Sequence, residues 1–114
     1  MSENKFQTVK TAEELQNLID NEDGILIYFS HEKCNVCKVL KPKIADRCKI
    51  QFPKIKLLYA DTELTPEISG QYSVFTVPSV IVFLGGKEFL RESRNISIET
   101  FTQKLERPYK MLFS

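Results

Sequence analysis

Three runs of apolar residues of strand-like length divide the chain. Residues 25–29 read Ile-Leu-Ile-Tyr-Phe, residues 55–60 read Ile-Lys-Leu-Leu-Tyr-Ala, and residues 79–84 read Ser-Val-Ile-Val-Phe-Leu. Short runs rich in β-branched and aromatic residues are typical of strands buried on both faces of a sheet. We therefore predict three central strands, with a short edge strand at residues 6–9.

Between these runs the hydrophobic residues recur at helical spacing. A first helix is predicted after Thr11, which stands three residues before Glu14 as in a capping box, and its apolar residues are Leu15, Leu18 and Ile19. A second helix is predicted from Cys34 to the region of Pro53, with an apolar stripe formed by Cys37, Leu40, Ile44 and Cys48. Pro42 should kink this helix, because proline removes a backbone hydrogen bond and crowds the preceding turn.

The second half of the chain continues the alternation of strands and helices. Thr65 is placed as the N-cap of a short helix that reaches about Tyr72, because the proline that follows it is favoured in a first helical turn. Gly85-Gly86 is a signal for a tight hairpin, after which residues 87–92 return as an antiparallel strand.

A last helix is predicted from Ser97 until it meets Pro108, with an apolar side formed by Ile98, Phe101 and Leu105. The resulting order of elements is βαβαβαββα. Strands that alternate with helices and end in a hairpin indicate an α/β sandwich with a mixed central sheet. A chain of 114 residues fits one domain, so we expect a single domain over residues 1–114.

The composition argues against several classes of partner. A net charge of +1 gives no overall attraction to nucleic acid or to an anionic membrane. The apolar runs are far shorter than the roughly 20 residues of a membrane span, and residues 1–5 lead into no run typical of a signal peptide. Three cysteines, an odd number, argue against a network of structural disulfides. We expect a cytoplasmic monomer that uses no cofactor.

Cys34-Asn35-Val36-Cys37 follows directly after a predicted buried strand and opens a predicted helix. The unpaired N–H groups and partial positive charge of a helix N-terminus favour a thiolate at Cys34. A cysteine at the N-cap can accept a hydrogen bond from the N–H of Cys37, and the same spacing lets Cys37 attack a mixed disulfide at Cys34. Lys33 and Lys38 add positive potential. The motif therefore predicts thiol–disulfide exchange.

On these residues the chain resembles the thioredoxin family over roughly residues 6–105. The positions that match, besides the cysteine pair, are Lys38, Pro42, Asp61, Val77-Pro78 and Gly85-Gly86. The resemblance implies a thioredoxin-like three-layer α/β/α sandwich that reduces protein disulfides, with a thioredoxin reductase as electron donor. It also implies that Pro78 is a cis-proline facing the disulfide and that the backbone of Val77 binds substrate.

Around the cysteines the chain departs from the family pattern. Asn35-Val36 stands where the family has Gly-Pro, Lys33 stands where it has a tryptophan, and Arg94 aligns with a small glycine on the substrate-facing rim. The catalytic pair is thus expected at Cys34 and Cys37, within an altered substrate surface that comprises Lys33, Val77, Pro78 and Arg94.

A buried charged pair of the family is also missing. The aspartate that assists the resolving cysteine aligns with Tyr28, and the lysine that accompanies it aligns with Leu57. Losing both together is physically reasonable, because losing one alone would leave a buried charge uncompensated at about 3–5 kcal/mol.

Two alternative functions are compatible with the sequence. The cysteine pair could report redox state to a dedicated partner with slow turnover, as a sensor or binding module. His31 with the two cysteines offers three metal ligands, but a structural zinc site requires four and no fourth is evident nearby, so we predict no metal.

Cys48 lies about 16 Å along the helix from Cys37 and is expected to be a core residue. A solvated helix face is expected for Lys38, Lys41 and Lys43.

Overall fold

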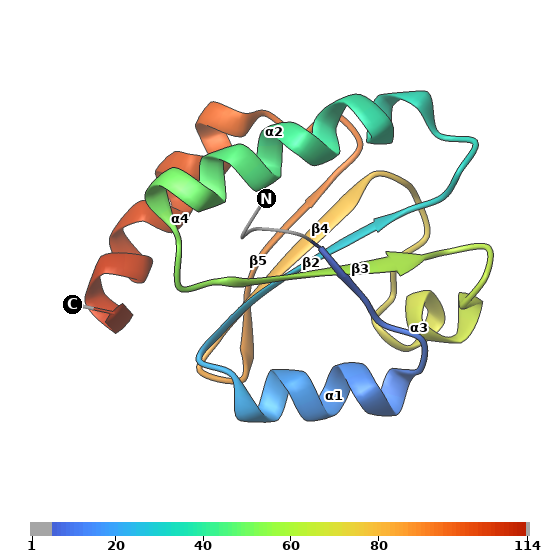
Figure 1. Ribbon diagram of the computed structural model, residues 1–114, viewed down its shortest axis with the longest axis horizontal. Coiled ribbons are helices and arrows are strands. Elements are labelled where there is room, and N and C mark those ends of the chain that lie inside the picture. The colour runs from blue at the N-terminus through green and yellow to red at the C-terminus, as the bar shows by residue number, and fades with distance from the viewer. Residues whose placement is uncertain (1–5, 114) are drawn as a thin grey trace.

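A computed structural model describes residues 6–113 of the chain. Its centre is a five-stranded sheet in the order β1-β3-β2-β4-β5 (Figure 1). The strands are β1 (Gln7–Thr8), β2 (Gly24–Ser30), β3 (Lys56–Asp61), β4 (Ser79–Leu84) and β5 (Lys87–Ser93). β1, β3 and β2 run parallel, whereas β4 pairs antiparallel with both β2 and β5. The mixed sheet and the order of elements are confirmed.

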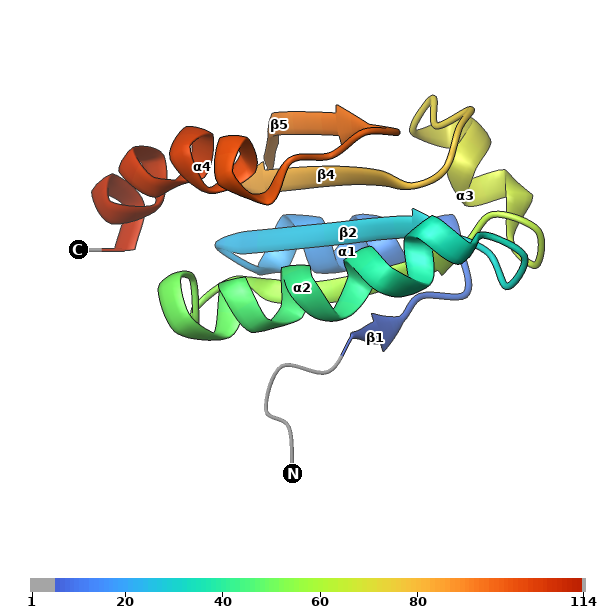
Figure 2. The same cartoon turned by 90° about the horizontal axis from the view of Figure 1, so that it is seen from above.

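Helices cover both faces of this sheet. They are α1 (Ala12–Asn21), α2 (Asn35–Gln51), α3 (Pro66–Gln71) and α4 (Ile98–Phe113). α2 and α4 lie on one face, and α1 and α3 lie on the other (Figures 1 and 2). The fold is therefore the predicted three-layer α/β/α sandwich. Within residues 6–113, no helix is long and apolar enough to cross a membrane.

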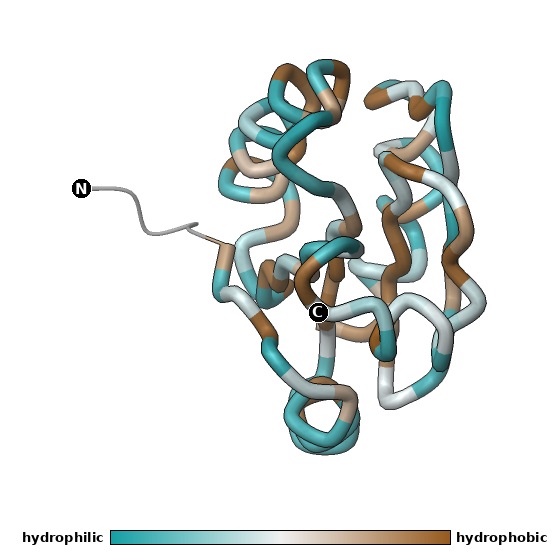
Figure 3. Tube along the Cα trace, turned by 90° about the vertical axis from the view of Figure 1, so that its right-hand side faces the viewer, coloured by the Kyte–Doolittle hydropathy of each residue, from teal (hydrophilic) through white to brown (hydrophobic). Residues whose placement is uncertain are grey.

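The two faces of β2 enter two separate cores. Leu26 and Tyr28 pack in the cluster beneath α2 and α4, whereas Ile25, Ile27 and Phe29 pack in the cluster beneath α1 and α3. Every residue of β2 is buried, which explains why this strand is apolar without alternation. Figure 3 shows α1 end-on at the bottom, with its hydrophobic residues toward the sheet.

The two helix N-caps and the glycine hairpin lie where the sequence predicts them, but two capping hydrogen bonds differ from the expected pattern. The N–H of Glu14 donates to Thr11 Oγ1 at 3.0 Å, but the Glu14 carboxylate accepts from the N–H of Lys10 rather than from that of Thr11. Thr65 occupies the N-cap of α3, yet its hydroxyl donates to the carbonyl of Asp61 instead of capping the helix. Gly85 and Gly86 have φ angles of 61° and 84°, as a two-residue hairpin with both central residues left-handed requires.

The two prolines expected to disturb helices lie within continuous helices. α2 runs through Pro42, and α4 runs through Pro108 to Phe113, although the sequence indicated an end near Pro108. The extension has a tertiary cause. The ring of Tyr109 packs edge-on against Phe52 at 5.1 Å between ring centroids and lies 4.7 Å from that of Phe113. This aromatic packing offsets the hydrogen bond that proline removes.

Candidate active site

The ends of β2 and β3 and the start of β4 lie at the same end of the sheet. β2 ends at Ser30, which is paired with Asp61 at the end of β3, and Phe29 is paired with Ser79 at the start of β4. The loop after β2 and the loop before β4 therefore lie side by side. The first carries Cys34, and the second carries Val77-Pro78, so the topology brings together motifs that are more than 40 residues apart in the sequence.

Cys34 and Cys37 form a disulfide in the first turn of α2. Their Cα atoms are 5.2 Å apart and their sulfur atoms are bonded at 2.10 Å. Cys34 is the N-cap residue of the helix, and the N–H of Cys37 donates to its sulfur at 3.2 Å, as the sequence predicts. Cys34 is partly exposed, whereas Cys37 is only 1% exposed. An incoming disulfide can therefore reach the sulfur of Cys34 but not that of Cys37.

The sulfur of Cys34, the more exposed of the two cysteines, has positively charged surroundings. Lys33 and Lys38 are exposed on either side of the cysteine pair. The N-terminus of the 17-residue helix α2 adds its partial positive charge at the same point. Both features favour a negatively charged sulfur at Cys34 in the reduced protein.

Behind the disulfide lies a buried phenol. Tyr28 is fully buried, and its hydroxyl donates to the carbonyl oxygen of Cys37 at 2.8 Å. Desolvation by burial raises the pKa of Tyr28, and the neighbouring Tyr59 raises it further, so Tyr28 stays protonated. Leu57 belongs to the same buried cluster. A neutral hydrogen-bond donor and an aliphatic side chain thus occupy the positions where the family pattern has a buried charged pair.

Lys41 does not lie on a solvated face, contrary to the prediction. Its ammonium group lies 4.0 Å from the ring centroid of Tyr59 and 5.2 Å from that of Phe6. Partial burial lowers the pKa of Lys41, although the charge of Glu32 acts in the opposite direction. The correction has a simple cause, since a long side chain gains more by covering an aromatic face than by extending into water. Lys38 and Lys43 are exposed as expected.

The loop before β4 forms the rim of the site on the side opposite the cysteine loop. The Val77–Pro78 peptide bond is cis, as the resemblance implies. The carbonyl of Pro78 accepts the N–H of Arg94 at 2.8 Å, and Ser79 Oγ donates to the carbonyl of Thr76 at 2.7 Å. Arg94 has a φ of 63°, the left-handed region that favours glycine. The structure therefore explains why a glycine would fit at this rim position.

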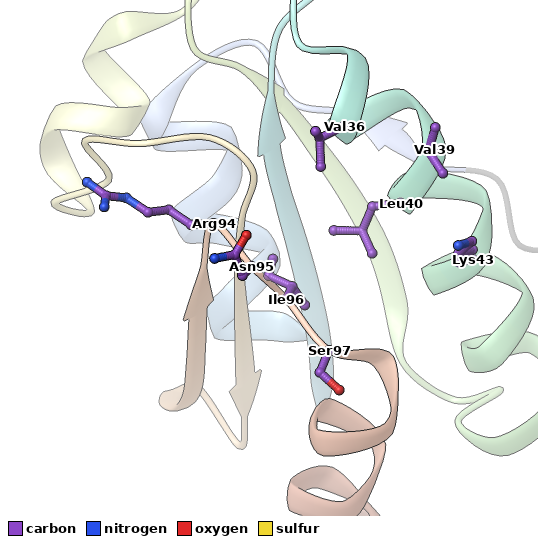
Figure 4. A pocket seen from close by; sticks show the side chains of 8 residues that line it. All are labelled: Val36, Val39, Leu40, Lys43, Arg94, Asn95, Ile96 and Ser97. Carbon is purple, nitrogen blue, oxygen red and sulfur yellow. The ribbon is translucent and has the colours of Figure 1, made fainter.

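A groove of about 500 Å³ runs beside the disulfide between α2 and the segment that joins β5 to α4 (Figure 4). Its walls are Val36, Val39, Leu40 and Lys43 from α2 and residues 94–97 from the connecting segment. Leu40 and Ile96 point into the space between these elements, whereas the side chain of Arg94 extends away from α2.

Sequence reasoning missed most of these apolar surface residues. Val36 is 64% exposed beside the cysteines, and Phe75 is 85% exposed in the loop that leads to Pro78. Their positions in the sequence could have indicated a place near the site, because Val36 lies inside the cysteine motif and Phe75 lies three residues before the proline. Ile96 carried no local signal, because only the fold places it opposite α2.

The remaining candidates have structural contacts. Nδ1 of His31 accepts the N–H of Lys33 at 3.2 Å, and within residues 6–113 no three side chains of metal-ligating type are grouped to hold an ion. Cys48 is a free core cysteine, as predicted, and burial raises its pKa to about 12. Asp61 is buried and its Oδ1 accepts the N–H groups of Glu63 and Leu64, so it closes the turn after β3.

Comparison with known proteins shows which family the chain resembles. The profile of the thioredoxin family matches residues 6–107. Thioredoxin-like protein YdfQ of Bacillus subtilis is 38% identical over 97 residues, which is 85% of this chain and 86% of that protein. Thioredoxin of Chlamydia trachomatis is 36% identical, over 59% of this chain and 65% of that protein.

Solved structures show the same fold. Mitochondrial thioredoxin 3 of Saccharomyces cerevisiae, in its oxidized form, superimposes with a TM-score of 0.79 at 19% identity, covering 90% of this chain and 94% of that one. Thioredoxin of Trypanosoma brucei brucei superimposes with a TM-score of 0.81 at 21% identity, covering 94% and 93%. The family match, the fold and a Cys-Xaa-Xaa-Cys pair at disulfide distance together establish that the chain belongs to the thioredoxin family and is a thiol–disulfide oxidoreductase.

Proposed function

We propose that the chain reduces protein disulfides with Cys34 as the nucleophile and Cys37 as the resolving cysteine. The Cys34 thiolate attacks one sulfur of the substrate disulfide, forming a mixed disulfide and releasing one substrate thiolate. The Cys37 thiolate then attacks the Cys34 sulfur, which breaks the mixed disulfide and releases the second substrate thiolate. Two electrons pass to the substrate, the two substrate thiolates take up protons, and the enzyme is left with its Cys34–Cys37 disulfide.

The difference in exposure between the two sulfurs carries this assignment. Cys34 is partly exposed at the N-cap of α2 between two lysines, and Cys37 is buried beneath it. A substrate can form a mixed disulfide at Cys34, while Cys37 is within one helical turn of that bond and sheltered from other reactants.

The resolving step lacks the acid–base partner of the family pattern. Tyr28, with its raised pKa, keeps its proton and cannot accept that of Cys37. Water entering the site is the proton acceptor in our proposal, and the positive charge of Lys38 assists it by favouring the thiolate. The consequence is a mixed disulfide that lives longer than one served by a buried carboxylate.

Substrate binding is assigned to the rim of the site. The backbone of Val77 beside Pro78 offers hydrogen-bonding groups to an extended substrate chain, with Lys33 and Arg94 on either side. We further propose that residues 1–114 act as one monomeric domain in the cytoplasm, and that a thioredoxin reductase restores the dithiol. In this role the protein carries electrons from the reductase to protein disulfides.

Single turnover with a protein disulfide tests the assignment. The reduced protein is mixed with an excess of a disulfide-containing protein, and released thiols and covalent adducts are followed by mass. Cys34→Ser should abolish the reaction, Cys37→Ser should accumulate the mixed disulfide, and Cys48→Ala is the matched control that should still react. Reaction by Cys34→Ser at the wild-type rate would disprove the proposal. Binding without turnover in the wild type would favour the redox-sensing module instead.

A further inference from the structure

Arg94 combines an unfavourable backbone with an exposed charge. Its φ of 63° lies in the left-handed region, where the Cβ of an L-residue is crowded. The N–H of Arg94 donates a hydrogen bond to the carbonyl of Pro78. This backbone hydrogen bond does not depend on which side chain residue 94 carries. A side chain kept where glycine would fit more easily points to a role for the side chain itself.

The guanidinium of Arg94 differs from those of two other arginines. Arg47 pairs with Glu99, and Arg91 pairs with Glu88 and donates to the carbonyls of Tyr72 and Ser73. Among residues 6–113, Arg94 has no carboxylate within salt-bridge distance, and its side chain extends from the rim away from α2 (Figure 4). It therefore presents an uncompensated positive charge on the rim of the site, from a backbone that is hydrogen-bonded to Pro78.

The apolar groove begins on the other side of the Arg94 backbone. Val36, Leu40 and Ile96 supply its hydrophobic surface, and Lys43 supplies a positive charge on the α2 side. With Lys33 and Lys38 exposed beside the cysteine pair, the charges that surround the groove and the disulfide are mainly positive, with Glu32 the acidic side chain in the same loop. An occupant of this surface should offer an apolar side chain and negative charge.

We propose that Arg94 is a specificity-determining residue that selects protein-disulfide substrates with an acidic residue close to the disulfide, while the groove takes a neighbouring apolar side chain. This inference rests on the proposed function of Cys34 as nucleophile. An exposed ion pair changes affinity by at most about fivefold. The effect is therefore a preference among substrates, and it weakens with salt because the charges are exposed.

Matched disulfide peptides test the preference. Each peptide carries a leucine next to one cysteine of its disulfide and a glutamate or a lysine two residues from that cysteine, on either side in turn. The rate constant for reduction by the reduced protein is measured for each, and the ratio of the glutamate rate to the lysine rate is the readout. The wild type should favour glutamate in at least one of the two placements, and 0.5 M salt should bring the ratio to about one.

Variants assign the preference to Arg94. Arg94→Gln removes the charge and keeps the Cβ, and it should lower the ratio by about three- to fivefold. Arg94→Lys should retain most of the ratio. Lys87→Gln, which removes an exposed charge from the hairpin at the opposite end of β4, is the matched control and should leave the ratio unchanged.

The outcomes separate the inference from the function on which it rests. Equal wild-type rates for glutamate and lysine peptides, or an unchanged ratio in Arg94→Gln, would overturn the inference while leaving disulfide reduction intact. Failure of the wild type to react with any peptide, and also with the small neutral hydroxyethyl disulfide, would overturn the proposed function itself.

Discussion

The disulfide lies between two layers in which the chain departs from the family pattern in different ways. Behind it, Tyr28 and Leu57 are buried in one cluster, at the two positions that align with a charged pair in the family pattern. In front of it, Lys33, Val36 and Arg94 are exposed, and none of them is a member of a buried ion pair. The buried layer changes as a unit, because a lone buried charge is strongly unfavourable, whereas the rim can change one residue at a time.

The comparison also separates two kinds of consequence. In the proposed mechanism, the buried layer sets how the proton leaves Cys37, and therefore the rate of the resolving step. The rim, in the same proposal, sets which disulfide reaches Cys34. Variants in the buried layer should therefore change stability and proton transfer, and variants at the rim should change substrate choice with small effects on stability.

Restoring only the buried acid should have the largest effect. Tyr28→Asp places a carboxylate without a lysine partner in the core and should lower the free energy of unfolding by about 3–5 kcal/mol. Tyr28→Phe should cost less, about 1–3 kcal/mol, because it removes the buried hydrogen bond from the phenol to the Cys37 carbonyl. Urea denaturation measures both. Adding Leu57→Lys to Tyr28→Asp should recover part of the loss, and a single variant as stable as wild type would show that the layer does not change as a unit.

The pH dependence of the resolving step sharpens the same comparison. Without an internal base, the reaction depends on the thiolate fraction of Cys37, which rises about tenfold per pH unit below the thiol pKa. Stopped-flow measurement of mixed-disulfide decay across neutral pH should therefore show a slow step that accelerates with pH. A rate that is fast and independent of pH would reveal an internal base other than Tyr28.

On the outer side, Cys34 should titrate below the value of about 8.5 for a free cysteine, owing to the helix N-terminus and the flanking lysines. The rate of alkylation of the reduced protein as a function of pH gives this pKa directly. Lys33→Gln should shift the pKa upward, and Lys87→Gln, far from the site, should not. A midpoint at or above the free value would argue against Cys34 as the nucleophile.

Cys48 provides a control within the buried layer. Cys48→Ala should lower the free energy of unfolding by about 1 kcal/mol through lost packing and leave disulfide exchange nearly intact. The folded-state pKa of Cys48 is raised from 9.0 to about 12, so its contribution to stability is present below pH 9 and declines as pH rises through that range. Part of the alkaline loss of stability should therefore disappear in Cys48→Ala. Loss of exchange with the fold preserved would place Cys48 in the reaction.

A change as small as that of Cys48→Ala, but of opposite sign, is expected at the rim. Arg94→Gly relieves the left-handed backbone and should raise the free energy of unfolding by about 1 kcal/mol. Because the same variant loses the charge, it should become less selective for acidic peptides as it becomes more stable. Thermal unfolding measures the change in stability, and the peptide assay measures the change in selectivity. A variant less stable than wild type would mean that the Arg94 side chain makes a stabilising contact.

The linear pattern of residues was sufficient for the order of elements and for the reactive pair. An uninterrupted apolar run predicted β2 as a strand buried on both faces, and the position of Cys34 before a helical stripe predicted its place at the N-cap of α2. Both are signalled by patterns within a few residues, namely an uninterrupted apolar run and the backbone N–H groups of one helical turn. Such patterns are local and can be read without the fold.

Contacts between distant residues were decided only by the tertiary structure. α4 continues through Pro108 because Tyr109 packs on Phe52, more than 50 residues earlier. Lys41 covers the ring of Tyr59, and Ile96 faces α2 across the groove. In each case the partner is supplied by another element of the fold. The packing energy that sets the position of the side chain exists only once the sheet has brought the two segments together.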